Sequence, residues 1–147
     1  NGPCVSPVNG RLHVADSEAR LIYDYAIDAD GGLSDKQVFV DTNPLNSSPD
    51  GCCFDDQGGL WTALVRAGAL ARFDPAGQLT HHIDLPVAHP SAVCFGGTDL
   101  TDLFVTSISD SGRLKADGPL DGCVLKLSGL GFRGIASPTC RLPLCWP

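Results

Sequence analysis

The chain has 147 residues, enough to bury a single core, and its formal charge of −7 comes without any cluster of basic residues. Nucleic acids and anionic membrane surfaces bind proteins that gather Lys and Arg on one face, so neither is expected as a partner. No apolar stretch approaches the roughly 20 residues of a spanning helix, and no charged-then-apolar leader opens the chain, which predicts a cytoplasmic protein without a membrane segment or signal peptide.

The composition favours strands over helices. Seventeen glycines, eleven prolines and no methionine accompany short apolar runs, a pattern typical of brief strands joined by tight turns. The predicted fold class is therefore all-β. The seven cysteines are an odd number without the spacing of a disulfide framework, and most lie inside apolar runs, so we expect buried reduced thiols. Cys140 and Cys145, in a Pro-rich tail, are the pair to test for a disulfide or a metal.

The same order of strand-like runs recurs three times along the chain. In chain order the runs are 1–5, 10–16, 19–25 and 36–40, then 50–54, 59–64, 68–74 and 79–83, then 91–95, 102–107 and 122–127. The spacing matches the period of a four-stranded propeller blade, whereas a β-sandwich would not repeat one strand order three times. We predict about three β-propeller blades within a domain at 1–136, with blades at about 1–48, 49–89 and 90–136, and a divergent tail at 137–147.

The repeat aligns three polar residues. Asn1, Asp50 and Ser91 each stand just before the innermost strand of their copy, and Asp50 and Ser91 directly follow a proline. Equivalent positions of neighbouring blades point into the top of one central channel, so these side chains should converge on a site.

Ten short stretches, read in order and spacing, point to one known family. They are Asn1-Gly2, Leu12-His13-Val14-Ala15-Asp16-Ser17, Tyr23-Asp24-Tyr25, Gly31-Gly32-Leu33-Ser34, Pro49-Asp50-Gly51, Gly58-Gly59-Leu60-Trp61-Thr62-Ala63, Arg72-Phe73-Asp74-Pro75-Ala76-Gly77, Cys94-Phe95-Gly96-Gly97, Leu103-Phe104-Val105-Thr106-Ser107 and Leu130-Gly131. On these residues the chain resembles the C-terminal half of the SMP-30/gluconolactonase/regucalcin-like family, which includes the LRE-like region. The resemblance implies about three four-stranded blades of a six-bladed β-propeller.

The resemblance also implies a chemistry. The family is a group of lactonases that hold one divalent cation at the channel mouth, through a glutamate, an asparagine matched by Asn1 and an aspartate matched by Asp50, which is also the general base. A hard cation bound by oxygen ligands polarises the lactone carbonyl while a carboxylate takes a proton from water. The implied reaction is hydrolysis of a sugar lactone to an aldonic acid, with Ca²⁺, Zn²⁺, Mg²⁺ or Mn²⁺ as the metal.

The sequence departs from the family in what it lacks. The metal-binding glutamate, the sugar-contacting Asn and Arg, and roughly three blades have no counterpart here, and Glu18 lies in a predicted turn and does not replace that glutamate. A cation held only by Asn1 and Asp50 would bind weakly, so we expect the isolated chain to be inactive. The alternative function is a non-catalytic, Ca²⁺-binding or structural propeller fragment of the regucalcin type, and a homodimer would cover its open sheet edges.

Other polar residues have simpler explanations. An aspartate before glycine, as at Asp50, is common in turns on backbone grounds alone. His81 and His82 are strand neighbours that point to opposite faces and cannot share one ion. His89 precedes Pro90 near the channel mouth, where it is a candidate for contacting the substrate, as is Ser91. No Gly-x-Ser-x-Gly elbow indicates serine hydrolase chemistry.

Overall fold

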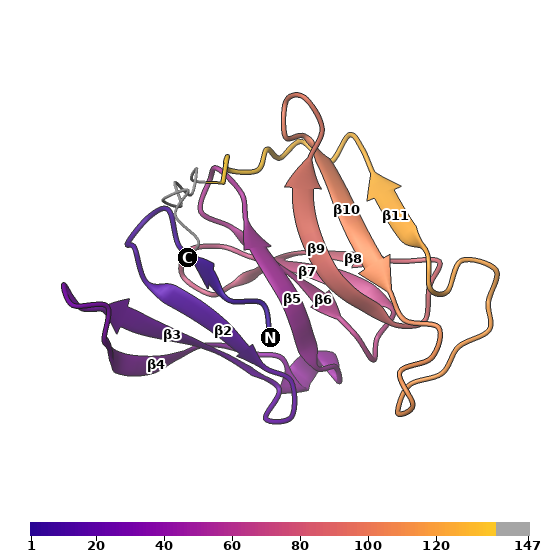
Figure 1. Ribbon diagram of the computed structural model, residues 1–147, viewed down its shortest axis with the longest axis horizontal. Helices are drawn as coiled ribbons and strands as arrows, with labels where there is room; N and C mark the ends of the chain where they lie inside the picture. Colours follow the sequence, from indigo (N-terminus) through magenta and orange to yellow (C-terminus); the bar gives the residue numbers. More distant parts are fainter. Residues whose placement is uncertain (138–147) are drawn as a thin grey trace, which may run out of the picture.

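The computed structural model describes residues 1–137 as three antiparallel sheets arranged side by side (Figure 1). The first sheet contains β1 (Cys4–Val5), β2 (Leu12–Asp16), β3 (Leu21–Ile27) and β4 (Leu33–Asp41). After a 3₁₀ turn, η1 (Asn43–Leu45), the second contains β5 (Pro49–Phe54), β6 (Leu60–Leu64), β7 (Ala69–Phe73) and β8 (Leu79–Asp84). The third contains β9 (Pro90–Gly96), β10 (Asp102–Ser107) and β11 (Val124–Leu127). Strands follow one another in sequence order within each sheet, which is the meander of a propeller blade.

Tight Asp-x-x-Gly turns join several of these strands. Gly58 and Gly77 adopt φ values of 78° and 77°, a left-handed conformation that glycine reaches without steric cost. The amide of Gly58 donates to the carbonyl of Asp55 at 3.0 Å, and that of Gly77 donates to the carbonyl of Asp74 at 2.9 Å. The local sequence therefore returns each chain segment onto the strand before it.

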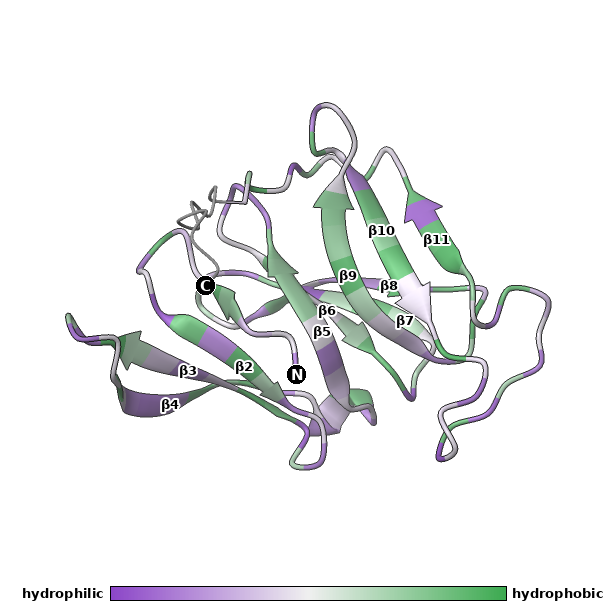
Figure 2. Ribbon diagram, in the orientation of Figure 1, coloured by the Kyte–Doolittle hydropathy of each residue, from purple (hydrophilic) through white to green (hydrophobic). Residues whose placement is uncertain are grey.

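The core lies between the sheets, and the middle sheet is buried on both faces. Along β6, Leu60 and Leu64 pack toward the first sheet, while Trp61 and Ala63 pack toward the third. This alternation follows from side chains pointing to opposite faces at successive strand positions. Every residue of β6 and β7 is consequently buried, and these strands are apolar over most of their length in Figure 2.

The third sheet has three strands in the described residues, so the prediction of four-stranded blades holds only for the first two sheets. After β11 the chain leaves the sheet, because its backbone hydrogen bonds go to neighbouring loops. The amide of Asp56 donates to the carbonyl of Arg133 at 2.8 Å, and the amide of Gly134 donates to the carbonyl of Leu100 at 2.7 Å. The predicted tail at 137–147, with Cys140 and Cys145, lies outside the described residues from position 138 onward.

The expectation of buried thiols is wrong for two cysteines. Cys94 and Cys123 are exposed, whereas the other three in the described chain are partly buried. Cys94 alternates along β9 with buried Val93 and Phe95, so strand geometry turns it away from the core. Within residues 1–137 the structure contains no helix with the length and apolar character that a membrane crossing requires.

Candidate functional site

The three inner strands lie side by side and begin at the same end of the molecule, at the lower side of Figure 1. Two glycines let them approach closely. A Cβ atom placed on Gly51 would lie 2.5 Å from the Cβ of Ala92 in β9, and one placed on Gly2 would lie 2.5 Å from the amide nitrogen of Cys52 in β5. Real side chains do not tolerate such distances, so glycine is required at both positions. The neighbouring residues Asn1, Asp50 and Ser91 therefore start from adjacent backbone positions.

A surface hollow of about 360 Å³ lies at this end of the strands. Asn1 and Asp50 both line it, so the structure brings together the two residues predicted as metal ligands. The other polar and charged side chains of its wall are Ser17, Glu18, Ser48, Arg66, Ser111 and Arg113. All of them come from the starts of inner strands or from the connections between second and third strands.

Asn1 is held in place by three hydrogen bonds. Its amino group donates to the carbonyl of Ala15 at 2.7 Å, and its carbonyl accepts from the amide of the same residue at 2.8 Å. Its side-chain nitrogen donates to the hydroxyl of Ser17 at 2.8 Å, and that hydroxyl donates to the carbonyl of Pro49. The side-chain nitrogen of Asn1 is thus engaged, which leaves its amide oxygen available as a ligand.

Asp50 is the acidic group best placed for chemistry. Burial raises the pKa of its carboxyl, and the nearby amino group of Asn1 opposes that shift. In residues 1–137 no hydrogen bond from the protein reaches its carboxylate oxygens, although the backbone carbonyl of Asp50 accepts from the thiol of Cys52. A half-buried carboxylate with free lone pairs suits a metal ligand or a general base.

The two predicted substrate contacts are placed less directly. The hydroxyl of Ser91 shares a hydrogen bond of 2.8 Å with the hydroxyl of Thr106, and Ser91 does not line the hollow. A ring nitrogen of His89 lies 2.9 Å from the carbonyl of Val65, whose side chain is part of the wall. His89 therefore stands behind the wall and supports it.

The six other polar or charged residues of the wall were not predicted from the sequence. Glu18 was assigned to a turn, which is correct, but that turn faces the hollow beside Asn1 and Asp50. Ser17 shares this turn. Arg66 occupies the bend after β6, and Arg113 lies in the long connection between β10 and β11. The predicted strand order could have located them, because in a meander every connection between a second and a third strand lies at the same end as the start of an inner strand.

The residues present fit part of a divalent cation site. Asp50 and Glu18 supply carboxylates and Asn1 supplies an amide oxygen, the ligand types that hard cations prefer. No group of three or more His, Cys, Asp or Glu residues within 1–137 is arranged to hold a metal ion. Calcium takes about six to eight oxygen ligands, so water or other protein segments must supply the rest. The strand pair His81 and His82 is not such a site, since His81 packs beside Trp61 while His82 lies near Asp84.

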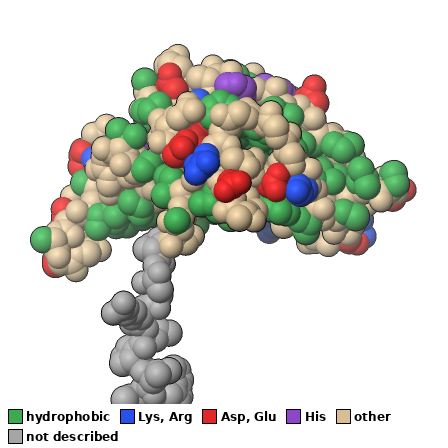
Figure 3. All heavy atoms as spheres, turned by 90° about the horizontal axis from the view of Figure 1, so that it is seen from above, with side chains coloured by type: hydrophobic (Ala, Val, Ile, Leu, Met, Phe, Trp, Pro, Cys, Tyr) green, Lys and Arg blue, Asp and Glu red, His purple; other side chains and the backbone are tan. Residues whose placement is uncertain are grey.

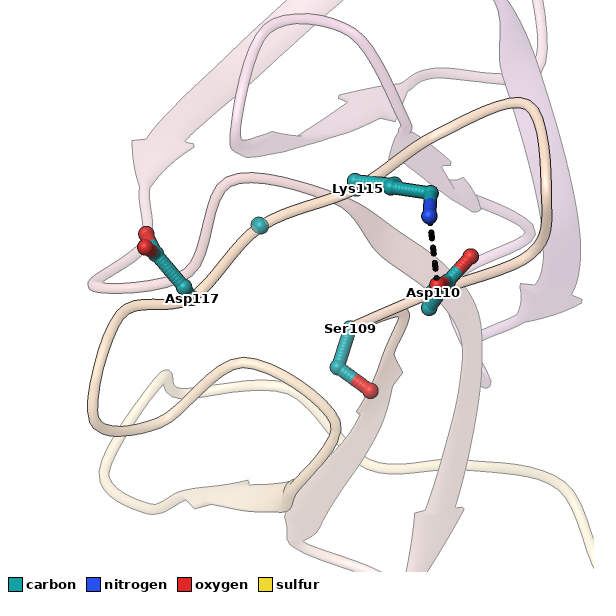
Figure 4. Close-up of a pocket in the computed structure, with 5 residues that line it drawn as sticks. Ser109, Asp110, Lys115 and Asp117 are labelled. Atoms are coloured by element: carbon teal, nitrogen blue, oxygen red, sulfur yellow. Dashed lines mark ion pairs between the residues drawn. The ribbon is translucent and has the colours of Figure 1, made fainter.

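A second hollow, of about 470 Å³, lies wholly within the β10–β11 connection (Figure 4). Its charged groups include Asp110 and Lys115, which form an ion pair of 3.0 Å, and Asp117, which points away from that pair. Because Asp110 and Lys115 satisfy each other on an exposed loop, they offer little to a ligand.

The family model described as SMP-30/Gluconolactonase/LRE-like region matches residues 1–109. The chain belongs to this family. Regucalcin from Danio rerio is 37% identical over 129 residues, covering 84% of this chain and 43% of the relative. The 6-deoxy-6-sulfogluconolactonase of Pseudomonas putida is 35% identical over 141 residues, covering 94% of this chain and 48% of the relative. The family thus includes lactonases.

The fold is confirmed by a solved structure of the same family. A calcium-binding protein, regucalcin, from Agrobacterium tumefaciens superposes with a TM-score of 0.83 at 28% identity, covering 97% of this chain and 49% of the other. The three sheets match half of a six-bladed β-propeller, as predicted. The chain spans about half the length of the curated relatives it matches.

Proposed function

We propose that this chain forms part of a divalent-metal-dependent lactonase that hydrolyses sugar lactones to aldonic acids. The observation that carries the proposal is the half-buried carboxylate of Asp50, with its raised pKa and unused lone pairs, beside Asn1 in a hollow of sugar size. Lactonases among the relatives, including one for a sulfonated gluconolactone, support the substrate class.

The residues have separate roles in this reaction. A divalent cation held by Asp50 and Asn1 would polarise the lactone carbonyl. Asp50, as general base, takes a proton from water while the water oxygen adds to the carbonyl carbon. The ring C–O bond then breaks, and the ring oxygen takes the proton back from Asp50 and leaves as the hydroxyl of an open-chain acid. Ser17 holds the amide of Asn1 in one orientation, which keeps the amide oxygen available.

The donor set does not select one metal. Carboxylate and amide oxygens accept Ca²⁺, Mg²⁺ or Mn²⁺, and Zn²⁺ also binds carboxylates. The calcium-binding relative supports Ca²⁺ as the first ion to test. With so few protein ligands, the affinity of the isolated chain for any of these ions should be low.

Further blades are needed to complete the channel. The face of the first sheet turned away from the second exposes Val5 and Val38 at 52% and 56%, and the third sheet exposes Val124 at 64%. Figure 3 shows exposed hydrophobic side chains toward both sides of the molecule. A second copy of the chain or another segment carrying three blades would cover these faces, and a homodimer is one such assembly.

A second candidate function is a non-catalytic, Ca²⁺-binding or structural propeller. The calcium-binding relative supports it. It predicts cation binding without turnover.

The two candidates separate in one experiment. Hydrolysis of glucono-δ-lactone and a panel of sugar lactones is followed by pH indicator, with and without each cation, and cation binding is measured by calorimetry. The variants are Asp50→Asn and the matched control Asp84→Asn, whose side chain is 91% exposed. Cation-dependent turnover lost only in Asp50→Asn supports the lactonase. Because the isolated chain is expected to be inactive under both candidates, binding without turnover supports the alternative when it is found in an assembly that completes the channel. Equal behaviour of both variants contradicts both.

A further inference from the structure

Two arginines reach the hollow from different sheets. Arg66 stands in the bend between β6 and β7, and Arg113 stands in the connection between β10 and β11. Both line the wall that also contains Asp50. Neither belongs to the predicted metal site, and the proposed hydrolysis gives neither a role.

These guanidinium groups have no ion-pair partner in residues 1–137, unlike four other Lys and Arg residues of that range. Ion pairs with aspartate involve Arg11, Arg72, Lys115 and Lys126. The carboxylates of Asp50 and Glu18 line the same hollow, yet no ion pair joins either of them to Arg66 or Arg113 within the described chain. The two cations are therefore available to a ligand.

The backbone that carries each arginine is fixed. The amides of Arg66 and Ala67 both donate to the hydroxyl of buried Ser47, at 3.0 and 3.1 Å. Arg113 lies inside a turn closed by Ser111 and Leu114, where the amide of Ser111 donates to the carbonyl of Leu114 at 3.0 Å. Each side chain thus extends from an ordered turn, which lowers the entropy lost when it binds.

A planar guanidinium recognises an oxyanion by paired, charge-assisted hydrogen bonds. A neutral polyol would leave both charges without a partner. The net charge of −7 repels anions at a distance, so a local pair of arginines is what would allow an anion to enter this hollow. Asp50 repels an anion as well, so the anionic group should lie against the arginines and away from Asp50.

We infer that Arg66 and Arg113 bind an anionic substituent of the sugar, and that the site selects lactones bearing a carboxylate, sulfonate or phosphate group remote from the ring ester. This inference rests on the proposed function for its substrate, but the binding of the anion itself does not require turnover. The two arginines act in specificity, and the bond-breaking steps remain with Asp50 and water.

Binding is tested with probes that cannot be hydrolysed. Glucose, glucose 6-phosphate, glucose 6-sulfate, glucuronate and inorganic phosphate are titrated into the protein by calorimetry or amide-shift NMR. The anionic sugars should bind about tenfold or more tightly than glucose, because two charge-assisted contacts act together, each of them modest after screening at an exposed site. Equal affinity of glucose and all three anionic sugars would overturn the inference. Inorganic phosphate binding as tightly as glucose 6-phosphate would also overturn it, by showing a site for free anions.

The residues are tested by Arg66→Gln and Arg113→Gln, singly and together, with Arg133→Gln as a matched control. Arg133 is an exposed arginine that lines a different hollow. Each site variant should weaken the anionic sugars about fivefold to tenfold and leave glucose unchanged, while Arg133→Gln should have no effect. An equal loss in the control would mean that only overall charge matters, and the assignment would fail.

Turnover separates the inference from the function on which it rests. In the wild type, kcat/KM for 6-phosphoglucono-δ-lactone should exceed kcat/KM for glucono-δ-lactone. In Arg66→Gln this ratio should fall, because KM for the phosphorylated lactone rises while kcat stays unchanged. Turnover of both lactones at equal efficiency contradicts the inference and keeps the lactonase. Arginine-dependent binding of anionic sugars without turnover, in an assembly that completes the channel, keeps the anion site and contradicts the lactonase.

Discussion

Replacing Asp55 with alanine should cause a large loss of stability, because this carboxylate is the centre of a buried polar network. Asp55 is fully buried and accepts hydrogen bonds from the indole nitrogen of Trp61 at 2.8 Å and from two guanidinium nitrogens of Arg72. The backbone amides of Gln57 and Gly59 also donate to it, at 3.1 and 2.8 Å. The network ties the turn between β5 and β6 to the strands β6 and β7.

The magnitude follows from what the substitution leaves behind. Arg72 has only 7% of its side chain exposed, so Asp55→Ala strands a buried positive charge, which costs about 3–5 kcal/mol. The indole nitrogen of Trp61 also loses its acceptor. The two losses overlap, so the total destabilisation stays within about 3–5 kcal/mol. For a chain of this size, with an m value of about 2 kcal/mol per molar urea, the unfolding midpoint should fall by about 2 M.

Urea unfolding followed by far-UV circular dichroism measures this shift. Asp110→Ala is the matched control, because it breaks the exposed ion pair with Lys115 and should leave the midpoint almost unchanged. Asp55→Asn keeps an acceptor for Trp61 but loses the charge, so its midpoint should lie between those of the wild type and Asp55→Ala. A midpoint shift below about 0.5 M for Asp55→Ala would refute the reasoning, since it would mean that Arg72 reaches water without its partner.

Two further predictions concern the strand contacts and pH. Gly51→Ala should lower the free energy of unfolding by about 1–3 kcal/mol and weaken cation binding at the hollow, because its Cβ would overlap Ala92. Gly32→Ala, in an exposed turn, should cost less stability. Urea midpoints measure the stability change and calorimetry measures the cation binding. Burial lowers the pKa of His13, so below about pH 6.5 the unfolded chain takes up a proton that the folded chain resists. The free energy of unfolding should therefore fall from pH 7.5 to pH 5.5, and less steeply in His13→Gln; equal slopes would contradict this.

The repeated strand order was readable in the sequence because strands such as β2, β3 and β10 alternate buried and less buried residues between recognisable turns. The bounds of the fourth strand of the first sheet could not be predicted from the sequence. The sequence run at 36–40 became β4, Leu33–Asp41, whose first residues are exposed and mostly polar and whose pairing with β3 shifts register twice. An edge strand without a buried face leaves little hydrophobic pattern, so its length depends on backbone pairing that the sequence does not display.

The same limit applies to the last sheet. The segment after β11 contains apolar residues, but Phe132 packs beside Trp61 and over the guanidinium of Arg72. That contact draws the segment back toward the second sheet and away from a fourth strand. The contact forms between residues far apart in sequence, so no local sequence pattern predicts it.

The candidate site was predicted in part for a topological reason that also explains its missing half. In each meander the inner strand starts at one end of the blade, and the connection between the second and third strands returns to that same end. Asn1 and Asp50 occupy starts, while Glu18, Arg66 and Arg113 occupy connections. The repeat aligned the starts, which directly precede the inner strands. The connections were not aligned, and the one between β10 and β11 is much longer than the other two.

It follows where the remaining ligands of the proposed cation must come from. Every further blade, whether it belongs to another segment or to a second copy, presents one strand start and one such connection to the channel end. Within residues 1–137 these positions supply Asp50, Glu18 and Asn1 as oxygen donors. Additional blades add donors without rearranging the existing ones, because Asn1 is already held by Ala15 and Ser17 and Asp50 lies on a strand packed between two others. We therefore propose that the chain supplies an ordered part of the cation site and that further blades complete it without a change in its shape.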